Sequence, residues 1–192
     1  MLGIFKKKTP GTITISLNAK LQPIHRGELE DAFTDVCEKE GFDAEIVGGG
    51  TLMDPSGEVR MCDIEIQLKD MTSENIEFVK GLFEAMLAPK GSYFTLSTDE
   101  KRTNFGNHEG LGLYLNGTDL PDEVYSQCDS NHVYEECERL VENIAQVNSH
   151  WQGPTETALY MYGTSFQDIK KAIQPLLDSY PLCQKARVEQ IA

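Results

Sequence analysis

A short segment near the N-terminus, TITISL (residues 12–17), has polar and apolar side chains in alternation. This pattern is typical of a strand with one buried face. Further along, apolar residues recur with helical spacing from Leu29 to Cys37, and Gly41 follows them as a helix stop. The sequence therefore predicts a strand that leads into a helix, with the apolar face of the helix packed against that strand.

The next part of the chain adds two strands, a second helix and a fourth strand. We expect a bulge or bend at Gly48–Gly50 and a turn at Asp54–Gly57. The predicted elements are a strand from Ala44 to Val47, a strand from Val59 to Leu68, a helix with its apolar face from Ile76 to Leu87 and Ser73 as its cap, and a strand from Ser92 to Ser97. The order β-α-β-β-α-β predicts a ferredoxin-like plait, in which two helices cover one face of a four-stranded antiparallel sheet.

The second half of the chain repeats this order. Its predicted elements are a strand from Gly110 to Leu115, a helix from Val133 to Ile144 capped by Asp129, Ser130 or Asn131, a short strand or turn from Ser149 to Gly153, a strand from Thr157 to Tyr162, a helix from Phe166 to Leu177 capped by Ser165, and a strand from Gln184 to Ile191. Pro175 should kink or break the last helix. The segments LNAKLQP (17–23) and LNGTDLP (115–121) echo each other, which favours duplication.

The fold class that follows is α+β, with two tandem ferredoxin-like (βαββαβ) plaits. We expect the first plait to occupy residues 1–100 and the second residues 101–192. The boundary should fall in the polar segment 99–107, which lacks hydrophobic periodicity.

The balance of charges limits the kinds of partner. The chain of 192 residues has 17 Lys and Arg against 31 Asp and Glu, a formal net charge of −14. Residues 1–100 hold 10 basic and 18 acidic residues, and residues 101–192 hold 7 and 13, so both halves are acidic. Nucleic acid and anionic membranes are excluded as expected partners, because binding them depends on basic side chains. A dense negative surface instead attracts a basic protein.

Neither a secretory signal nor a membrane span is expected, and the protein should be cytoplasmic. Lys6–Lys8 follow the short apolar start of the chain, whereas a signal peptide has its charge first. The five cysteines are scattered without a CxxC pair, which favours reduced, buried thiols. We expect no cofactor and no metal: Asp63 and Glu65 share one strand face and Asp129 joins an acidic loop, but neither set has the spacing of a calcium loop.

No catalytic motif is visible. Nucleophilic catalysis needs Ser or Cys with a positioned histidine and an acid, and the sequence contains no nucleophile elbow and no phosphate-binding loop. The loop before the strand at Gly110 is the most site-like, because it combines His108 and Glu109 with flexible glycines. We therefore expect no catalytic residues, and keep an enzyme with its site near His108 and Glu109 as an alternative.

Acidic and aromatic side chains of the second half are the candidate partner-binding residues. They are Asp119, Asp122, Glu123, Trp151, Tyr160 and Tyr162. Exposed Tyr and Trp anchor many interfaces, and the two tyrosines alternate with the apolar residues of their strand. An alternative is that these tyrosines are buried, either between the two plaits or in a homodimer.

Two segments, GLGLYLNGTDLP (110–121) and YPLCQKARVEQIA (180–192), resemble stretches of small bacterial α+β proteins that are similar to immunity proteins of polymorphic toxin systems. That resemblance implies a cytosolic protein that neutralises a basic toxin by occluding its active site, and it assigns no catalytic residue. The alternative from the fold is a regulatory protein that senses a small molecule at the interface of the two halves.

Overall fold

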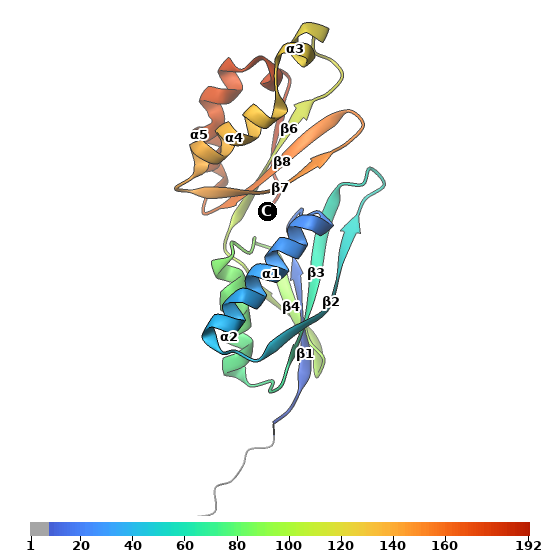
Figure 1. Cartoon of the computed structure of the whole chain (residues 1–192), viewed down its shortest axis with the longest axis vertical. Helices are drawn as coiled ribbons and strands as arrows, with labels where there is room; N and C mark the ends of the chain where they lie inside the picture. The colour runs from blue at the N-terminus through green and yellow to red at the C-terminus, as the bar shows by residue number, and fades with distance from the viewer. Residues whose placement is uncertain (1–7) are drawn as a thin grey trace, which may run out of the picture.

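The computed structural model describes residues 8–192, which form two sheets stacked along the long axis of the molecule (Figure 1). Helices cover one face of each sheet. The first half contains β1 (Gly11–Leu17), α1 (Pro23–Glu40), β2 (Ala44–Met53), β3 (Val59–Leu68), α2 (Ser73–Ala85), β4 (Ser92–Leu96) and β5 (Asp99–Phe105). The second half contains β6 (Glu109–Asn116), α3 (Asp122–Gln127), α4 (Ser130–Val141), β7 (Ala145–Gln152), β8 (Glu156–Gly163), α5 (Phe166–Ser179), a 3-10 turn (Pro181–Cys183) and β9 (Arg187–Gln190).

The two sheets have the same topology. The strand order is β2-β3-β1-β4-β5 in the first sheet and β7-β8-β6-β9 in the second, and the paired strands are antiparallel. If β5 is set aside, both orders are those of the ferredoxin-like plait. The prediction of two tandem ferredoxin-like plaits of class α+β is therefore confirmed.

Local sequence signals account for most element ends. Gly41 follows α1 in the left-handed conformation, with φ of 64°. The side chains of Asp129 and Ser165 cap α4 and α5. The cap of α2 lies one residue earlier than predicted, because the side chain of Thr72 rather than that of Ser73 accepts from the Asn75 amide.

Three elements differ from the prediction. Residues 99–105 form β5, a fifth strand paired with β4, so the first sheet extends past residue 100 to Phe105. Polar strands at a sheet edge lack the alternation by which strands are recognised. The short helix α3 was not predicted. The helix α5 continues through Pro175, because its apolar face is anchored in the core while the proline faces solvent.

Each half has its own hydrophobic core, but the first core extends across the junction. It includes Tyr114, Trp151, Ala158, Tyr160 and Tyr162 from the second half. These residues lie on the face of the second sheet that points away from α4 and α5. The second core, between that sheet and its helices, is separate.

The N-terminal residues that bear on a secretory signal, 1–7, lie outside the described part of the chain. Within residues 8–192, no helix is both long enough and apolar enough to cross a membrane. The five cysteines are free thiols, and four of them, Cys37, Cys62, Cys137 and Cys183, are buried as expected. Burial raises the pKa of the Cys62 thiol to about 12.

Candidate ligand pocket between the two halves

A small polar cluster joins the halves where the open face of the second sheet meets the first. One oxygen of the Glu58 carboxylate accepts hydrogen bonds from the hydroxyls of Tyr114 and Tyr160, each at 2.7 Å. The Lys20 ammonium lies 2.8 Å from the same oxygen. Three donors from both halves therefore converge on one carboxylate.

The chemistry of this cluster holds Glu58 as an anion. Burial by itself raises the pKa of the Glu58 carboxyl, but hydrogen bonds from Lys20, Tyr160 and Tyr114 outweigh burial and leave the pKa below its ordinary value of 4.5. Burial and the hydrogen bond to Glu58 raise the pKa of both tyrosine hydroxyls, which stay protonated as donors.

Two further contacts fix the segment between β1 and α1 against the second sheet. The Tyr162 hydroxyl accepts from the Lys20 amide at 2.8 Å, and the Ser149 hydroxyl donates to the Lys20 carbonyl at 2.6 Å. Tyr160 is 0% exposed and Tyr162 is 2% exposed. The expectation that these tyrosines are exposed anchors for a partner is therefore wrong: they are buried between the two halves of the chain itself.

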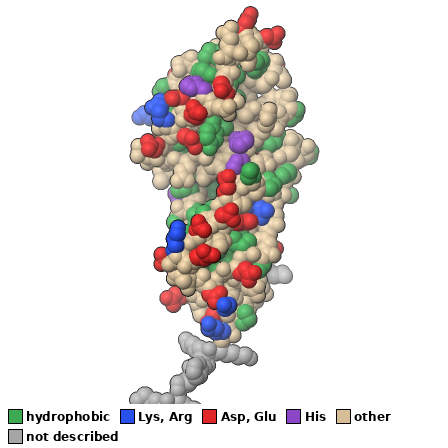
Figure 2. All heavy atoms as spheres, viewed as in Figure 1, with side chains coloured by type: hydrophobic (Ala, Val, Ile, Leu, Met, Phe, Trp, Pro, Cys, Tyr) green, Lys and Arg blue, Asp and Glu red, His purple; other side chains and the backbone are tan. Residues whose placement is uncertain are grey.

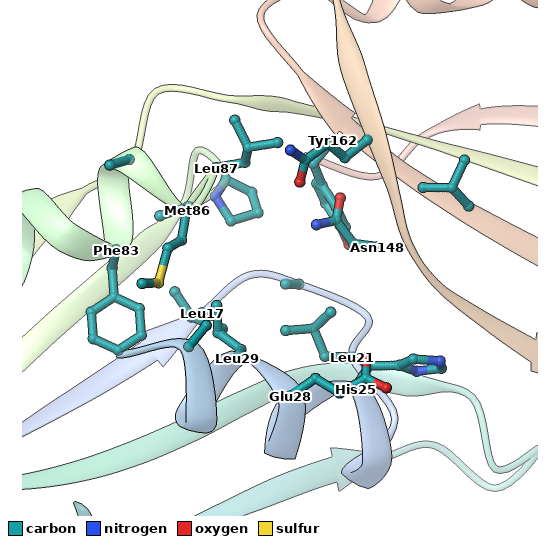
Figure 3. A pocket seen from close by; sticks show the side chains of 17 residues that line it. Leu17, Leu21, His25, Glu28, Leu29, Phe83, Met86, Leu87, Asn148 and Tyr162 are labelled. Carbon is teal, nitrogen blue, oxygen red and sulfur yellow. The ribbon is translucent and has the colours of Figure 1, made fainter. Parts of the chain in front are cut away.

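Beside this junction lies a pocket of about 420 Å³. Figure 3 shows its lining, which comes from the end of β1, from α1, from the C-terminal end of α2 and from β7 and β8. The lining residues are Leu17, Ala19, Leu21, His25, Glu28, Leu29, Ala32, Phe83, Ala85, Met86, Leu87, Ala88, Pro89, Gln146, Val147, Asn148 and Tyr162. Its volume is within the range of small-molecule sites.

The pocket has an apolar end. Phe83 and Met86 lie on the left of the view in Figure 3, Leu17 and Leu29 lie beside the Phe83 ring, and Leu87 lies above them. Leu87 follows α2 in the left-handed conformation, with φ of 64°. This conformation is uncommon for a residue other than glycine, and it accompanies the turn that ends α2.

The other end of the pocket is polar. His25 Nδ1 and Asn148 Oδ1 are buried there without a hydrogen-bond partner among the described residues. Asn148 is the extra residue of a bulge in β7, because Val147 pairs with Met161 while Ser149 pairs with Tyr160. Bulges redirect side chains and are frequent at functional sites. Buried polar atoms are normally paired, so these two atoms mark a place where a ligand can supply the missing bonds.

A second pocket, of about 350 Å³, is lined by His25 and Glu28 as well. The other side of this second pocket is formed by α4, including Tyr134, and by His150. The His25 and His150 rings meet edge to face with centroids 5.0 Å apart. Burial, followed by repulsion from His150, lowers the pKa of His25 below its ordinary value of 6.5, and the opposite effect of Glu28 is smaller. Burial and His150 therefore both favour the neutral form of the His25 ring.

The remaining candidate partner-binding residues lie apart from the tyrosines. Asp119, Asp122 and Glu123 are exposed on and just before α3, at the far end of the second half (Figure 1). Trp151 is only 9% exposed and belongs to the core at the junction. The structure does not bring the acids and the aromatic residues into one surface.

At the alternative site near His108, the Glu109 carboxylate makes contacts that support the fold. One Glu109 oxygen lies 2.7 Å from the Lys90 ammonium, and the other accepts from the Phe166 amide at the start of α5 at 2.8 Å. The Lys90 hydrogen bond, then the Phe166 amide, hold the pKa of Glu109 below its ordinary value. Within residues 8–192, no three side chains of the metal-binding types come together as a metal site.

The sequence did not single out the pocket. His25 was one histidine among four, and Asn148 carries no motif. The only available signal was the irregular alternation around Asn148 in β7. The pocket is assembled from segments of both halves, so no local pattern contains it.

No protein-family model and no curated protein matches this chain. Among solved structures, the chain is similar to an unknown protein from Galdieria sulphuraria, at 10% identity and a TM-score of 0.31 over 95% of this chain and 98% of that one. A mutant chlorite dismutase from Candidatus Nitrospira defluvii is similar at 9% identity and a TM-score of 0.31, over 94% and 89% of the two chains. A putative glycine cleavage system transcriptional repressor is similar at 10% identity and a TM-score of 0.31, over 95% and 97%.

Proposed function

We propose that this chain is a ligand-binding regulatory protein, which takes up a small organic molecule in the pocket between its two halves. The observation that carries the proposal is the pair of buried, unpaired polar atoms, His25 Nδ1 and Asn148 Oδ1, in the lining of a 420 Å³ pocket with an apolar opposite end. An unpaired buried polar atom costs about 1 to 3 kcal/mol. A ligand that bonds to these atoms recovers part of this cost.

The position of the pocket supports a regulatory role. A molecule bound there contacts α1 and α2 of the first half together with β7 and β8 of the second. Such a ligand adds to the contacts between halves that Glu58 and Tyr162 already make. Binding therefore stabilises one arrangement of the two halves, and the stabilisation follows the ligand concentration.

The test is thermal unfolding in the presence of a panel of small metabolites, followed by calorimetric titration of any compound that raises the unfolding temperature. Asn148→Ala should weaken binding about tenfold, through the loss of one hydrogen bond. Asn143→Ala is the matched control, since Asn143 is exposed after α4 and outside the pocket.

A third variant, Val147→Phe, narrows the pocket from β7 and should abolish binding. The proposal is rejected if no compound in the panel shifts the unfolding temperature, or if Asn148→Ala and Val147→Phe leave the binding of a responding compound unchanged.

A second candidate function rests on the acidic surface. Figure 2 shows Asp and Glu side chains gathered over the face that α1 presents to solvent, and Glu28, Asp31, Asp35 and Glu38 are exposed there. A basic protein partner, such as the toxin of an immunity-type pair, would be attracted to this face. The acids near α3 would supply a second negative patch, and the buried tyrosines take no part in this candidate function.

This second candidate predicts a complex whose association slows strongly as salt is added. Charge reversal at Asp31 and Asp35 should slow the association further at low salt, whereas reversal at Asp178 on α5 serves as the control. If the chain protects cells from no toxin encoded beside its own gene and captures no basic partner, the second candidate is dropped.

A further inference from the structure

The charge of the pocket lining restricts the ligand. Among the described residues, 8–192, neither Lys nor Arg lines the 420 Å³ pocket or the adjacent one that shares His25. Glu28 is the only carboxylate in both linings, and no ion pair engages Glu28 within residues 8–192. A carboxylate or phosphate ligand would therefore find no positive side chain there, while a cation would find an unpaired negative one.

The polar atoms of the lining point to the same kind of ligand. Asn148 Oδ1 is an acceptor, and the ring nitrogen of a neutral histidine that carries no proton is an acceptor too. The Glu28 carboxylate adds two acceptor oxygens. These acceptors complement a headgroup that donates hydrogen bonds, and an ammonium group has three donors.

The apolar end of the pocket determines what the rest of the ligand can be. Phe83 and Met86 lie there, and neither side chain has a formal charge (Figure 3). An apolar body placed there leaves water, and the transfer favours binding by about 25 cal/mol for each Å² buried. The polar and apolar ends lie on opposite sides of one cavity, so a single small molecule can occupy both.

We infer that the ligand is an organic cation, a primary amine with a compact aryl or alkyl body, and that its ammonium group binds among Glu28, Asn148 and His25. This inference rests on the proposed ligand-binding function. The amine donates to Asn148 Oδ1 and to the Glu28 carboxylate, and its body packs against Phe83 and Met86. The net charge of −14 raises the concentration of cations near the protein and favours the same ligand class.

The experiment uses matched probes that differ only in the headgroup. 2-Phenylethylamine, 2-phenylethanol and 3-phenylpropionate share one aryl body and are positive, neutral and negative at pH 7. A parallel set pairs alkylamines from butyl to octyl with the alcohols and carboxylates of the same length. Calorimetric titration of the full chain should give the tightest binding for the amine of each set, about tenfold tighter than the alcohol.

Two variants identify the charge that matters. Glu28→Gln keeps the shape of the side chain and should weaken the binding of the amines about tenfold, with little change for the alcohols. Glu38→Gln is the control on the same helix, because Glu38 is exposed like Glu28 but does not line the pocket. Thermal unfolding of both variants verifies that they fold.

The outcomes separate the inference from the proposed function. If the alcohols or carboxylates bind and the amines do not, or if Glu28→Gln leaves amine binding unchanged, the cation inference is overturned while the pocket remains a ligand site. If no probe of any charge binds with a Kd below about 1 mM, and the metabolite panel also has no effect, both are overturned.

Discussion

The two plaits share one topology, yet the open faces of their sheets differ. In the first sheet, Thr14 on β1 lies between Glu65 and Thr95, and this face is left to solvent without helices. In the second sheet, Tyr114 and Tyr160 occupy the open face and are buried against the first half. The difference teaches that the chemistry of the open face, not the fold, decides which sheet serves as an interface.

Glycines make the tyrosine face possible. Gly112 precedes Tyr114 on the same face of β6, and a Cβ atom at Gly112 would lie 2.8 Å from the Tyr114 ring. A Cβ at Gly110 would likewise crowd the Tyr162 ring, at 2.7 Å. The absence of side chains at Gly110 and Gly112 leaves room for these two rings, whose hydroxyls reach Glu58 and the Lys20 amide.

The largest loss of stability is expected when a buried tyrosine is removed from the open face of the second sheet. Tyr160→Ala removes a fully buried ring and a donor to Glu58, and should lower the free energy of unfolding by about 3 to 5 kcal/mol. Tyr93→Ala removes a half-buried tyrosine from the open face of the first sheet and should cost about 1 kcal/mol. Urea unfolding of the two variants measures the difference. Equal losses would contradict the assignment of the interface to the second sheet.

A smaller loss is expected at the carboxylate that joins the halves. Glu58→Gln keeps an acceptor oxygen but removes the charge that pairs with Lys20, and should cost about 2 kcal/mol. Glu45→Gln, at an exposed position of β2, should change stability by less than about 0.5 kcal/mol. Chemical unfolding reports both values, and a Glu58→Gln protein as stable as the Glu45→Gln protein would exclude the cluster as a link between the halves.

The same carboxylate predicts a dependence on pH. Its folded pKa is lower than 4.5, so its contribution to stability is complete above that value and is lost as the pH falls through the folded pKa. The stability gap between the native chain and Glu58→Gln should therefore be constant near neutral pH and close in acid. Unfolding curves at a series of pH values test this, and a gap that widens in acid has the wrong sign for the stated cause.

The smallest effect has the opposite sign. Asn148→Ala removes an unpaired buried acceptor, so the chain without ligand should be as stable as before or up to about 1 kcal/mol more stable. The unfolding temperature without ligand measures this. A clear loss of stability would show that Asn148 Oδ1 already has a hydrogen-bond partner within the fold. The main argument for a polar ligand group at this pocket would then fail.

The sequence predicted the fold well because the fold depends on local periodicity. The alternation in β1 and the helical spacing in α1 and α5 are each contained in one continuous segment of at most 18 residues. The sequence does not reveal the strand β5, because the residues before Phe105 are polar and show no apolar alternation, although Phe105 itself is buried. Most of the segment 99–107, in which the sequence places the boundary between the halves, therefore belongs to the first sheet.

The candidate site was predicted much less well. The sequence places the acids Asp119, Asp122 and Glu123 in one loop, whereas Asp122 and Glu123 lie in α3 and only Asp119 precedes it. All three lie far from Tyr160 and Tyr162, the tyrosines predicted to share a surface with them. Alternation shows that Tyr160 and Tyr162 point away from Leu159 and Met161, and it contains no information on what covers the other face. The structure shows the alternative arrangement, in which Tyr160 and Tyr162 are buried between the two halves.

The sequence by itself determined the two plaits, their strand order and the negative charge of both, because periodicity, caps and charge are properties of neighbouring residues. Only the tertiary structure decided that the tyrosine face packs on the first half and that His25 and Asn148 line one pocket. Those contacts join residues that are between 56 and 142 positions apart. They depend on how the surfaces of the two folded halves fit together, which no local pattern in the sequence contains.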